Sequence, residues 1–475
     1  MGGGALVTAA VVASSPQTVL VGGIPTMYRQ TGVAGVPLSF TLVMTIIAIL
    51  AVGYVAVGRH VKHGAPFYAQ MVHGGAGPTL GLAAAGVAFV GYNALQISLY
   101  PLLGVTVVSL VGGVWWGWAL AAWLIVLALG RYPGAVNAKV LGVLLAVEVA
   151  VIGLFIAAGF THPVGGEVSL VVFRPSGLLV PGMAASVVVF AVAAFAGVES
   201  VLAYAEEATS HRVLAQATFT AIGVCGLLYV LASWAYGGWL GLTDLQNAAG
   251  TDTSQPIALL GSIFGSGIAD LATLLLVTSV LAAMSAFHSA VARYVFALAR
   301  ERVLPARWAA VSRGARGGAP LGGSTVQAAT AAIVLIVFLV LRADPMTVVF
   351  TWLSAIGAFC ILLLTAASWS ALGFFDRGRG GAESTWVRRV FPFTGGVLGV
   401  LCVVFMASNL DALLGTPPSS PLPSLVAAPI GAAILTGLAG GGWLRHTRPD
   451  VYAGLGHGVP DPARVLDDDL ADVEI

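Results

Sequence analysis

Long apolar stretches alternate with short polar loops along the whole 475-residue chain. Many of these stretches reach the roughly 20 residues with which an α-helix crosses a bilayer. We therefore predict an all-α polytopic membrane protein with twelve transmembrane helices, over residues 5–28, 36–57, 78–103, 111–129, 138–160, 181–205, 216–240, 268–296, 320–341, 347–373, 391–410 and 424–444. A polar stretch from Thr243 to Gln255 follows the seventh helix and leads into a short helix that begins at Pro256.

Composition supports the same class. Apolar residues make up 58% of the chain and charged residues 9%, whereas a soluble domain carries about 25% charged residues. The three cysteines each stand alone in an apolar run, so we expect them to pack between helices and not to form disulfides or a metal site. A net charge of +1 indicates no nucleic-acid partner. Lys62 and Lys139 are the only lysines, and this preference for arginine fits a GC-rich bacterial genome.

The loop charges predict the orientation in the cell membrane. With the N-terminus in the cytoplasm, all but three of the 21 basic residues fall on the inner side, and only Arg29, Arg174 and Arg342 fall outside. This bias follows the positive-inside rule. An even number of crossings then places both termini in the cytoplasm, with residues 445–475 as a cytoplasmic tail.

Two of the predicted helices contain residues that do not suit a continuous membrane helix. The first holds VVASSPQTVLVGGIP, from Val11 to Pro25, and the sixth places Glu199 near mid-membrane beside Ala196 and Gly197. A charge at that depth costs about 3 kcal/mol on insertion scales and normally faces a cavity or a partner. The alternative for the first helix is a simple proline kink with serines bonded back to the helix.

The spacing of the two interruptions favours a transporter. They lie in the first and sixth helices, an odd offset of five, so residues 1–160 and 181–373 would form inverted repeats, with 391–444 as accessory helices. Paired broken helices in inverted halves are typical of secondary transporters with a midplane site. Their half-helix ends would attract the carboxylate and the ammonium of an amino acid. The candidate substrate-binding residues of the first helix are Ser14, Ser15, Pro16, Gln17 and Thr18.

Two motifs resemble the amino acid-polyamine-organocation permeases. FAGVES followed by AEEATSHR, Phe195 to Arg212, is similar to the sixth helix of that family, and RYVFALARERVLP, Arg293 to Pro305, is similar to the end of its eighth. The resemblance implies a five-plus-five inverted-repeat fold with helices one and six unwound around the substrate. It also implies an aromatic cover at Phe195 and a substrate contact at Ala196 and Gly197.

The same resemblance suggests an inner gate. Glu206, Glu207 and Arg212 would form its salt bridges, or else only a solvated helix end.

The chain departs from the family at its coupling position. Some proton-coupled members carry a lysine midway along helix five, where this sequence has Glu148, and no predicted helix contains a lysine at mid-membrane depth. The first-helix Gly-Ser-Gly of many members is also replaced, by Ala13 to Pro16. We expect Glu148, Glu199 or both to exchange protons; the alternative is a protonated glutamate that joins two helices, which is worth about 1 kcal/mol or less.

Further polar side chains are candidates for the site. Tyr92 and Gln96 share a face of the third helix and would line or gate the site, or join helices. Ser285 and Ser289 share a face of the eighth and could hold sodium, whereas His288 fits a packing role. Trp115, Trp116 and Trp118 suit an interfacial belt.

The motif search excludes the common enzymes. The sequence lacks a Walker A motif, HExxH, GxSxG and a ligand cluster for haem or iron-sulfur, so we expect no catalytic site, cofactor or metal. We predict a proton-coupled symporter of a neutral amino acid. Exchange of amino acids or polyamines, a channel and a membrane sensor remain alternatives.

Overall fold

The computed structural model describes residues 2–61, 63–132, 138–180, 183–204, 210–241, 245–249, 255–312, 318–380, 383–417 and 419–458. Every regular element in these ranges is a helix. The all-α class predicted from the sequence is therefore confirmed for the described part of the chain.

The elements of the first half are α1 (Gly3–Ser14), α2 (Pro16–Thr18), η1 (Val19–Gly23), α3 (Ile24–Thr31), α4 (Val36–Gly58), α5 (Pro66–His73), α6 (Pro78–Val111), α7 (Trp115–Leu129), α8 (Ala138–Thr161), η2 (Leu170–Phe173), α9 (Pro175–Leu178), α10 (Ala184–Ala194) and η3 (Val198–Tyr204). Several of them begin with proline. The first N–H groups of a helix have no partner within the helix, so the N–H that proline lacks is not missed there. Gly112 ends α6 with a φ of 76°, which glycine adopts without strain.

The elements of the second half are α11 (His211–Leu240), α12 (Leu245–Ala248), α13 (Gln255–Phe264), α14 (Ser266–Arg300), η4 (Ala306–Ala309), α15 (Leu321–Val340), η5 (Pro345–Phe350), α16 (Thr351–Ala358), α17 (Ile361–Asp376), η6 (Trp386–Val390), α18 (Phe391–Ala407), α19 (Leu410–Leu414), α20 (Leu422–Thr447) and α21 (Pro449–Gly454). Ser210 begins α11 as a side-chain cap, since its hydroxyl accepts the Val213 N–H.

Ten helical segments of the described chain are long and apolar enough to cross a membrane. The fourth and sixth predicted crossings coincide with shorter apolar helices, Trp115–Leu129 and Ser186–Leu202. Each of the twelve predicted stretches thus contains helix, while the number of crossings stays a prediction.

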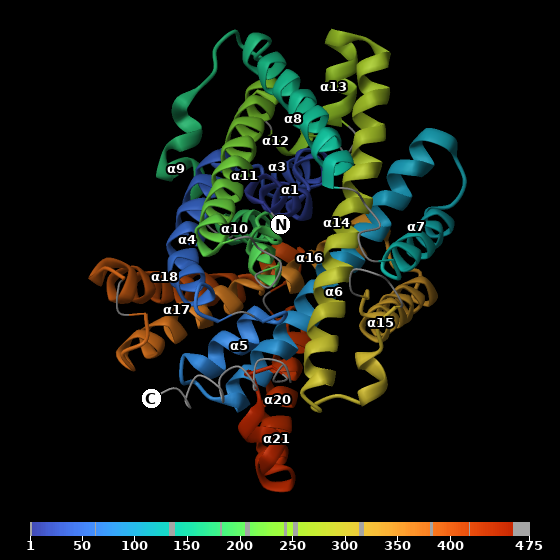
Figure 1. The fold of residues 1–475 in the computed structure, drawn as a ribbon. Helices are drawn as coiled ribbons and strands as arrows, with labels where there is room; N and C mark the ends of the chain where they lie inside the picture. Colours follow the sequence, from blue (N-terminus) through green and yellow to red (C-terminus); the bar gives the residue numbers. More distant parts are fainter. Residues whose placement is uncertain are drawn as a thin grey trace.

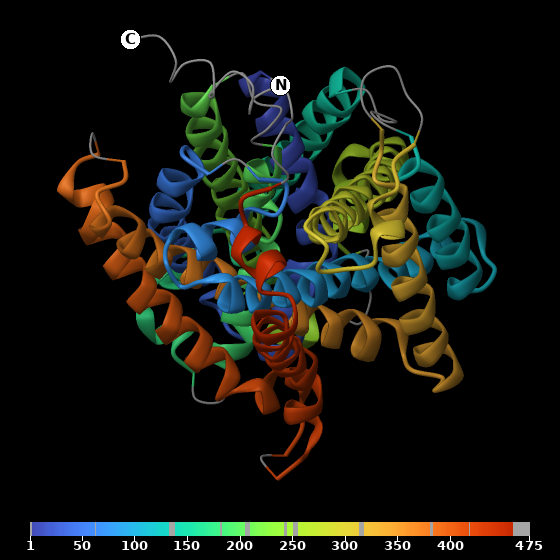
Figure 2. The same cartoon turned by 60° about the horizontal axis from the view of Figure 1, so that its bottom comes forward.

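The helices gather around α1. In Figures 1 and 2, α17 and α18 lie at one side of the molecule and α7 and α15 at the other, with α1 between them. The two longest helices, α6 with 34 residues and α14 with 35, pack against each other, and α20 packs along α6. α1 itself packs against α8, α11, α14 and η3, so the first interrupted segment lies deep in the protein.

Candidate functional site

The helix that begins at Gly3 is interrupted at Ser15. Ser15 has φ 44° and ψ 73°, in the left-handed region, and its N–H bonds the carbonyls of Val11 and Val12. Pro16, which has no N–H to donate, begins the next helical segment. The Ser14 hydroxyl bonds back to Ala10 O at 3.2 Å. The interruption therefore stands where the Ser-Ser-Pro sequence predicted it.

A second interruption contacts the first. α10 ends at Ala194, Gly197 has a φ of 109°, and η3 begins at Val198. A Cβ placed on Gly197 would lie 2.9 Å from the carbonyl carbon of Ala13. Glycine thus allows the two backbones to cross in contact.

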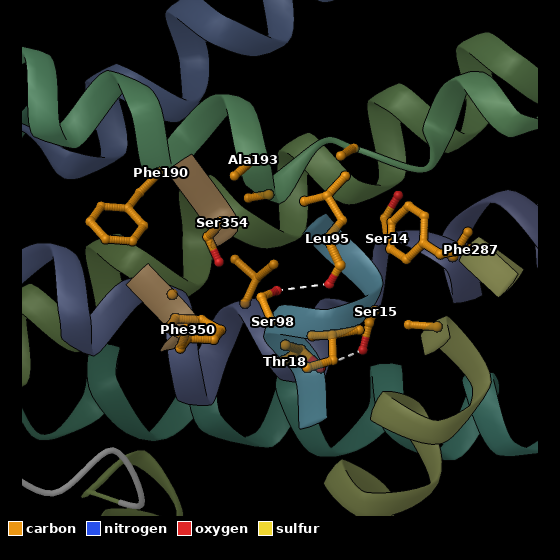
Figure 3. A pocket seen from close by; sticks show the side chains of 17 residues that line it. Ser14, Ser15, Thr18, Leu95, Ser98, Phe190, Ala193, Phe287, Phe350 and Ser354 are labelled. Carbon is orange, nitrogen blue, oxygen red and sulfur yellow. Dashed lines mark hydrogen bonds between the residues drawn. The ribbon is translucent and has the colours of Figure 1, made fainter. Parts of the chain in front are cut away.

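A cavity of about 70 Å³ lies beside this crossing. Its hydroxyl-bearing residues are Ser14, Ser15, Thr18, Ser98 and Ser354. Its other lining residues are small or apolar, namely Ala13, Val19, Gly23, Leu95, Leu99, Phe190, Ala193, Ala194, Ala196, Ala283, Phe287 and Phe350. Figure 3 shows Phe190 and Phe350 toward one end and Phe287 toward the other. The walls thus offer apolar surface, hydroxyls and the backbone of the interrupted segments.

Glu148 of α8 meets the first interruption directly. Its Oε1 accepts the Gln17 N–H at 2.8 Å and the Ser279 hydroxyl at 3.0 Å. Ser279 of α14 shares a further hydrogen bond with Ser15 at 2.8 Å, and Ser15 shares one with Thr18. A continuous chain of hydroxyls therefore joins the buried carboxylate to two residues of the cavity wall.

Glu199 braces the second interruption. Its carboxylate accepts the Gly197 N–H and the Tyr92 hydroxyl, each at 2.9 Å. Its carbonyl accepts the Tyr54 hydroxyl at 3.1 Å. Glu199 is buried.

The candidate substrate-binding residues divide into two groups. Ser14, Ser15, Thr18 and Ala196 line the cavity, whereas the remaining candidates belong to its surroundings. Those surrounding residues are Pro16, Gln17, Tyr92, Gln96, Phe195 and Gly197.

Two of the surrounding side chains pair with other parts of the protein. Gln96 donates to Tyr100 at 2.8 Å and accepts from Gln327 at 2.6 Å. Phe195 packs edge-on against Phe40 and Tyr229.

The hydroxyls expected on the eighth helix point elsewhere. Ser285 and Ser289 each bond a carbonyl of their own helix, those of Leu281 and Ser285, both at 2.8 Å. Ser279 is instead the serine of α14 that reaches the interruption. His288 bonds Ser324 at 2.7 Å, in keeping with a packing role.

The cavity wall includes none of the described gate and belt candidates, and Trp115 is partly buried against the hydrophobic core. Glu206 and Glu207 lie outside the described residues, and Arg212 is exposed at the start of α11. Trp116 and Trp118 are exposed, and Trp118 bonds Gly112 O at 2.9 Å.

Sequence reasoning missed the cavity face of α6, which presents Leu95, Ser98 and Leu99. Spacings of three and four residues place these three side chains on one face, and that was the available signal. The wall residues of α10, α16 and η5 gave no such signal, because their types are common in any apolar helix.

Within the described residues, no three His, Cys, Asp or Glu side chains gather as a group that could hold a metal ion. The site is therefore described by its hydroxyls, its two glutamates and its interrupted backbone.

The comparisons with known proteins are as follows. The family model for amino acid permeases matches residues 10–448. The chain is similar to a crystal structure of a manganese transporter from Eremococcus coleocola in complex with an aromatic bis-isothiourea substituted compound, with 14% identity, 93% of both chains covered and a TM-score of 0.59. A crystal structure of a histidine-to-alanine mutant of the Eremococcus coleocola manganese transporter gives 16% identity with the same coverage and TM-score. No curated protein sequence matches.

Proposed function

The chain belongs to the amino acid permease family, and we propose that it carries a neutral amino acid across a bacterial cytoplasmic membrane by proton-coupled symport. Structural similarity to transporters of the same superfamily supports the secondary-transporter class. In this proposal residues 1–160 and 181–373 are the inverted repeats, and both termini are cytoplasmic.

The observation that carries the proposal is the cavity at the crossing of the two interrupted segments. Helix ends expose unpaired carbonyls and N–H groups. Carbonyls at the ends of α1 and α10 suit an ammonium group. The Gln17 and Gly197 N–H groups are already bonded to Glu148 and Glu199, so the hydroxyls of the cavity wall are left to meet a carboxylate. The cavity wall beside them is built of hydroxyls and apolar side chains, which favours a substrate with a small uncharged side chain.

Glu148 is the proposed coupling group. When Glu148 is ionised, Ser279 donates to it, so Ser15 donates to Ser279 and Thr18 donates to Ser15. A proton arriving on Glu148 would leave only a neutral, weaker acceptor at the end of this chain and weaken its bond to the Gln17 N–H. Protonation would thereby alter the interrupted backbone and the hydroxyls that face the substrate.

Glu199 is the less direct candidate for coupling. Its bonds to Gly197 and Tyr92 suit a bracing role for the second interruption. Exchange of one amino acid for another on the same site is the alternative mode, since it needs no net proton movement.

Uptake into proteoliposomes tests the function. Neutral, acidic and basic amino acids, a polyamine and Mn²⁺ would each be offered with and without an inward proton gradient. We expect saturable accumulation of a neutral amino acid above its equilibrium level when the gradient is present. Accumulation of only Mn²⁺ or a polyamine would contradict the proposed cargo, and flux that never exceeds equilibrium would indicate a channel.

A further inference from the structure

A third buried carboxylate lies away from the cavity, at the end of α14. Glu301 is 9% exposed. Its Oε1 accepts from His63 Nε2 and from the Gly458 N–H, both at 3.0 Å. Its Oε2 accepts from the Tyr68 hydroxyl and from the Gly456 N–H, the latter at 3.0 Å. Four donors from three separate segments thus converge on one side chain.

His63 donates to Glu301 from Nε2. Its Nδ1 accepts the Ala65 N–H at 3.0 Å, so the ring proton belongs on Nε2, the atom that faces Glu301. Burial alone would raise the pKa of Glu301, but hydrogen bonds from His63, Gly456 and Tyr68 outweigh it and hold the pKa below its ordinary value. Hydrogen-bond donors from three segments therefore stabilise the carboxylate.

The C-terminal donors sit on a backbone shaped for this contact. Gly456 and Gly458 have φ values of 82° and 72°, which other residues adopt only under strain. A Cβ on Gly456 would lie 2.8 Å from the Cβ of Val72 in α5. The Gly456 carbonyl bonds His73 Nε2 at 3.1 Å, and Leu455 is fully buried. Paired N–H groups of this kind form an anion-binding concavity.

Hydrogen bonds also hold the residues before this segment. Arg448 donates to the carbonyl of Arg302 at 3.0 Å, and Tyr452 shares a hydrogen bond with Thr79 at 2.9 Å. In Figure 2, α21 and the chain that follows it come forward beside α5.

α5 in turn contacts the elements around the second interruption. Phe67 stacks on Tyr54 with ring centroids 4.5 Å apart, and Gln70 donates to the Tyr54 carbonyl at 3.0 Å. The Tyr54 hydroxyl bonds the Glu199 carbonyl. A continuous set of contacts therefore leads from the C-terminal segment through α5 to η3.

We propose that α5 and the end of α14 form a docking site for a Gly-X-Gly segment, and that residues 455–458 occupy it as a strap holding α5 across the cytoplasmic end of the transport path. The placement of this strap on the cytoplasmic side rests on the proposed function. Its release frees α5 and opens the cytoplasmic side.

The first experiment measures exposure of α5 directly. Ala69, fully buried in α5, is changed to cysteine and labelled with a water-soluble maleimide in inside-out vesicles. We expect Gly456→Val to raise the labelling rate on the order of tenfold, which corresponds to about 1.4 kcal/mol of lost docking energy. Gly454→Val is the matched control, because nothing lies within 4 Å of its added Cβ, and it should leave the rate unchanged.

A truncation pair covers the case in which Gly456→Val fails to fold. A chain ending at Gly454 lacks the strap, whereas one ending at Gly458 keeps it. Fast labelling in the first and slow labelling in the second supports the strap, and equal labelling overturns it. Since labelling requires no substrate, this outcome is independent of whether the proposed cargo is correct.

Discussion

The N–H of Gln17 donates to the carboxylate of Glu148 over 2.8 Å, from a segment 131 residues away in the chain. The N–H groups at the start of a helix have no partner within it, and this one lies directly after Pro16. Glu148 therefore caps the second part of the interrupted helix from a neighbouring helix, and it does so inside the protein.

Glu148→Gln separates the capping role from proton exchange. Glutamine keeps a carbonyl that can accept the Gln17 N–H, but it cannot take up a proton at this position. We expect exchange of substrate across proteoliposomes to persist while gradient-driven accumulation is lost. Accumulation equal to that of the unmodified protein would contradict the coupling role. Ser285→Ala is the matched control, because that hydroxyl donates to its own helix in the structure.

Gly197→Ala tests the crossing of the two interrupted segments. The added methyl would lie 2.9 Å from the Ala13 backbone at a φ of 109°, which costs about 1–3 kcal/mol of stability. We expect a lower Tm in detergent. Gly153→Ala, where nothing lies within 4 Å, should leave the Tm unchanged or raise it. Equal effects of the two substitutions would show that the crossing tolerates a side chain.

Ala193→Phe fills the cavity. A ligand at 100 times its Kd stabilises a protein by about 2.7 kcal/mol, so a substrate identified by uptake should raise the Tm of the unmodified chain. We expect this ligand-induced rise to disappear in the variant. Ala432→Phe adds the same ring at an exposed position of α20 and should retain it. A retained shift in both variants would place the substrate elsewhere.

Acidification should weaken the contact at Glu301. Its folded-state pKa lies below the ordinary value of 4.5, so its contribution to stability is present above that pH and is lost as the pH falls through the folded pKa. His63, Tyr68 and the two glycine N–H groups face the carboxylate, and His73 and His457 lie nearby.

The substitution Glu301→Gln measures how much the ionised carboxylate contributes to stability. Its Tm should lie below that of the unmodified protein at neutral pH, and the two should converge at low pH. Parallel Tm curves at all pH values would contradict the assignment.

The sequence predicted which stretches are helical and the place of the first interruption for identifiable reasons, but not the lengths of the helices, since α6 runs to Val111 where the prediction ended at 103. Apolar length and loop charge determine which stretches enter a membrane, and Pro16 cannot continue the hydrogen-bond ladder of a helix. The rotation of each helix about its axis was harder to predict. The buried surface of α6 carries Tyr92 and Gln96 as well as Leu95, Ser98 and Leu99. The sequence alone did not mark which of these side chains line the cavity, and the prediction settled on Tyr92 and Gln96.

The remaining differences between the prediction and the structure arise from packing between helices that are distant in the sequence. Ser279 and Ser285 are alike in type and setting along the sequence, yet Ser279 alone of the two meets Ser15. Glu301 and the glycines after α21 lie 155 and 157 residues apart, and no periodicity links them. The inverted repeats stay a prediction.

The length of α14 separates the Glu301 contact, at the end of that helix, from the cavity. Its apolar sequence is interrupted by Arg293, and about 10 Å of helix follows before Arg300, at 1.5 Å per residue. A hydrocarbon layer about 30 Å thick cannot enclose 35 helical residues standing upright, which span roughly 52 Å. In the proposed orientation, the Glu301 contact, directly after the last residue of α14, therefore lies beyond the hydrocarbon layer on the cytoplasmic side.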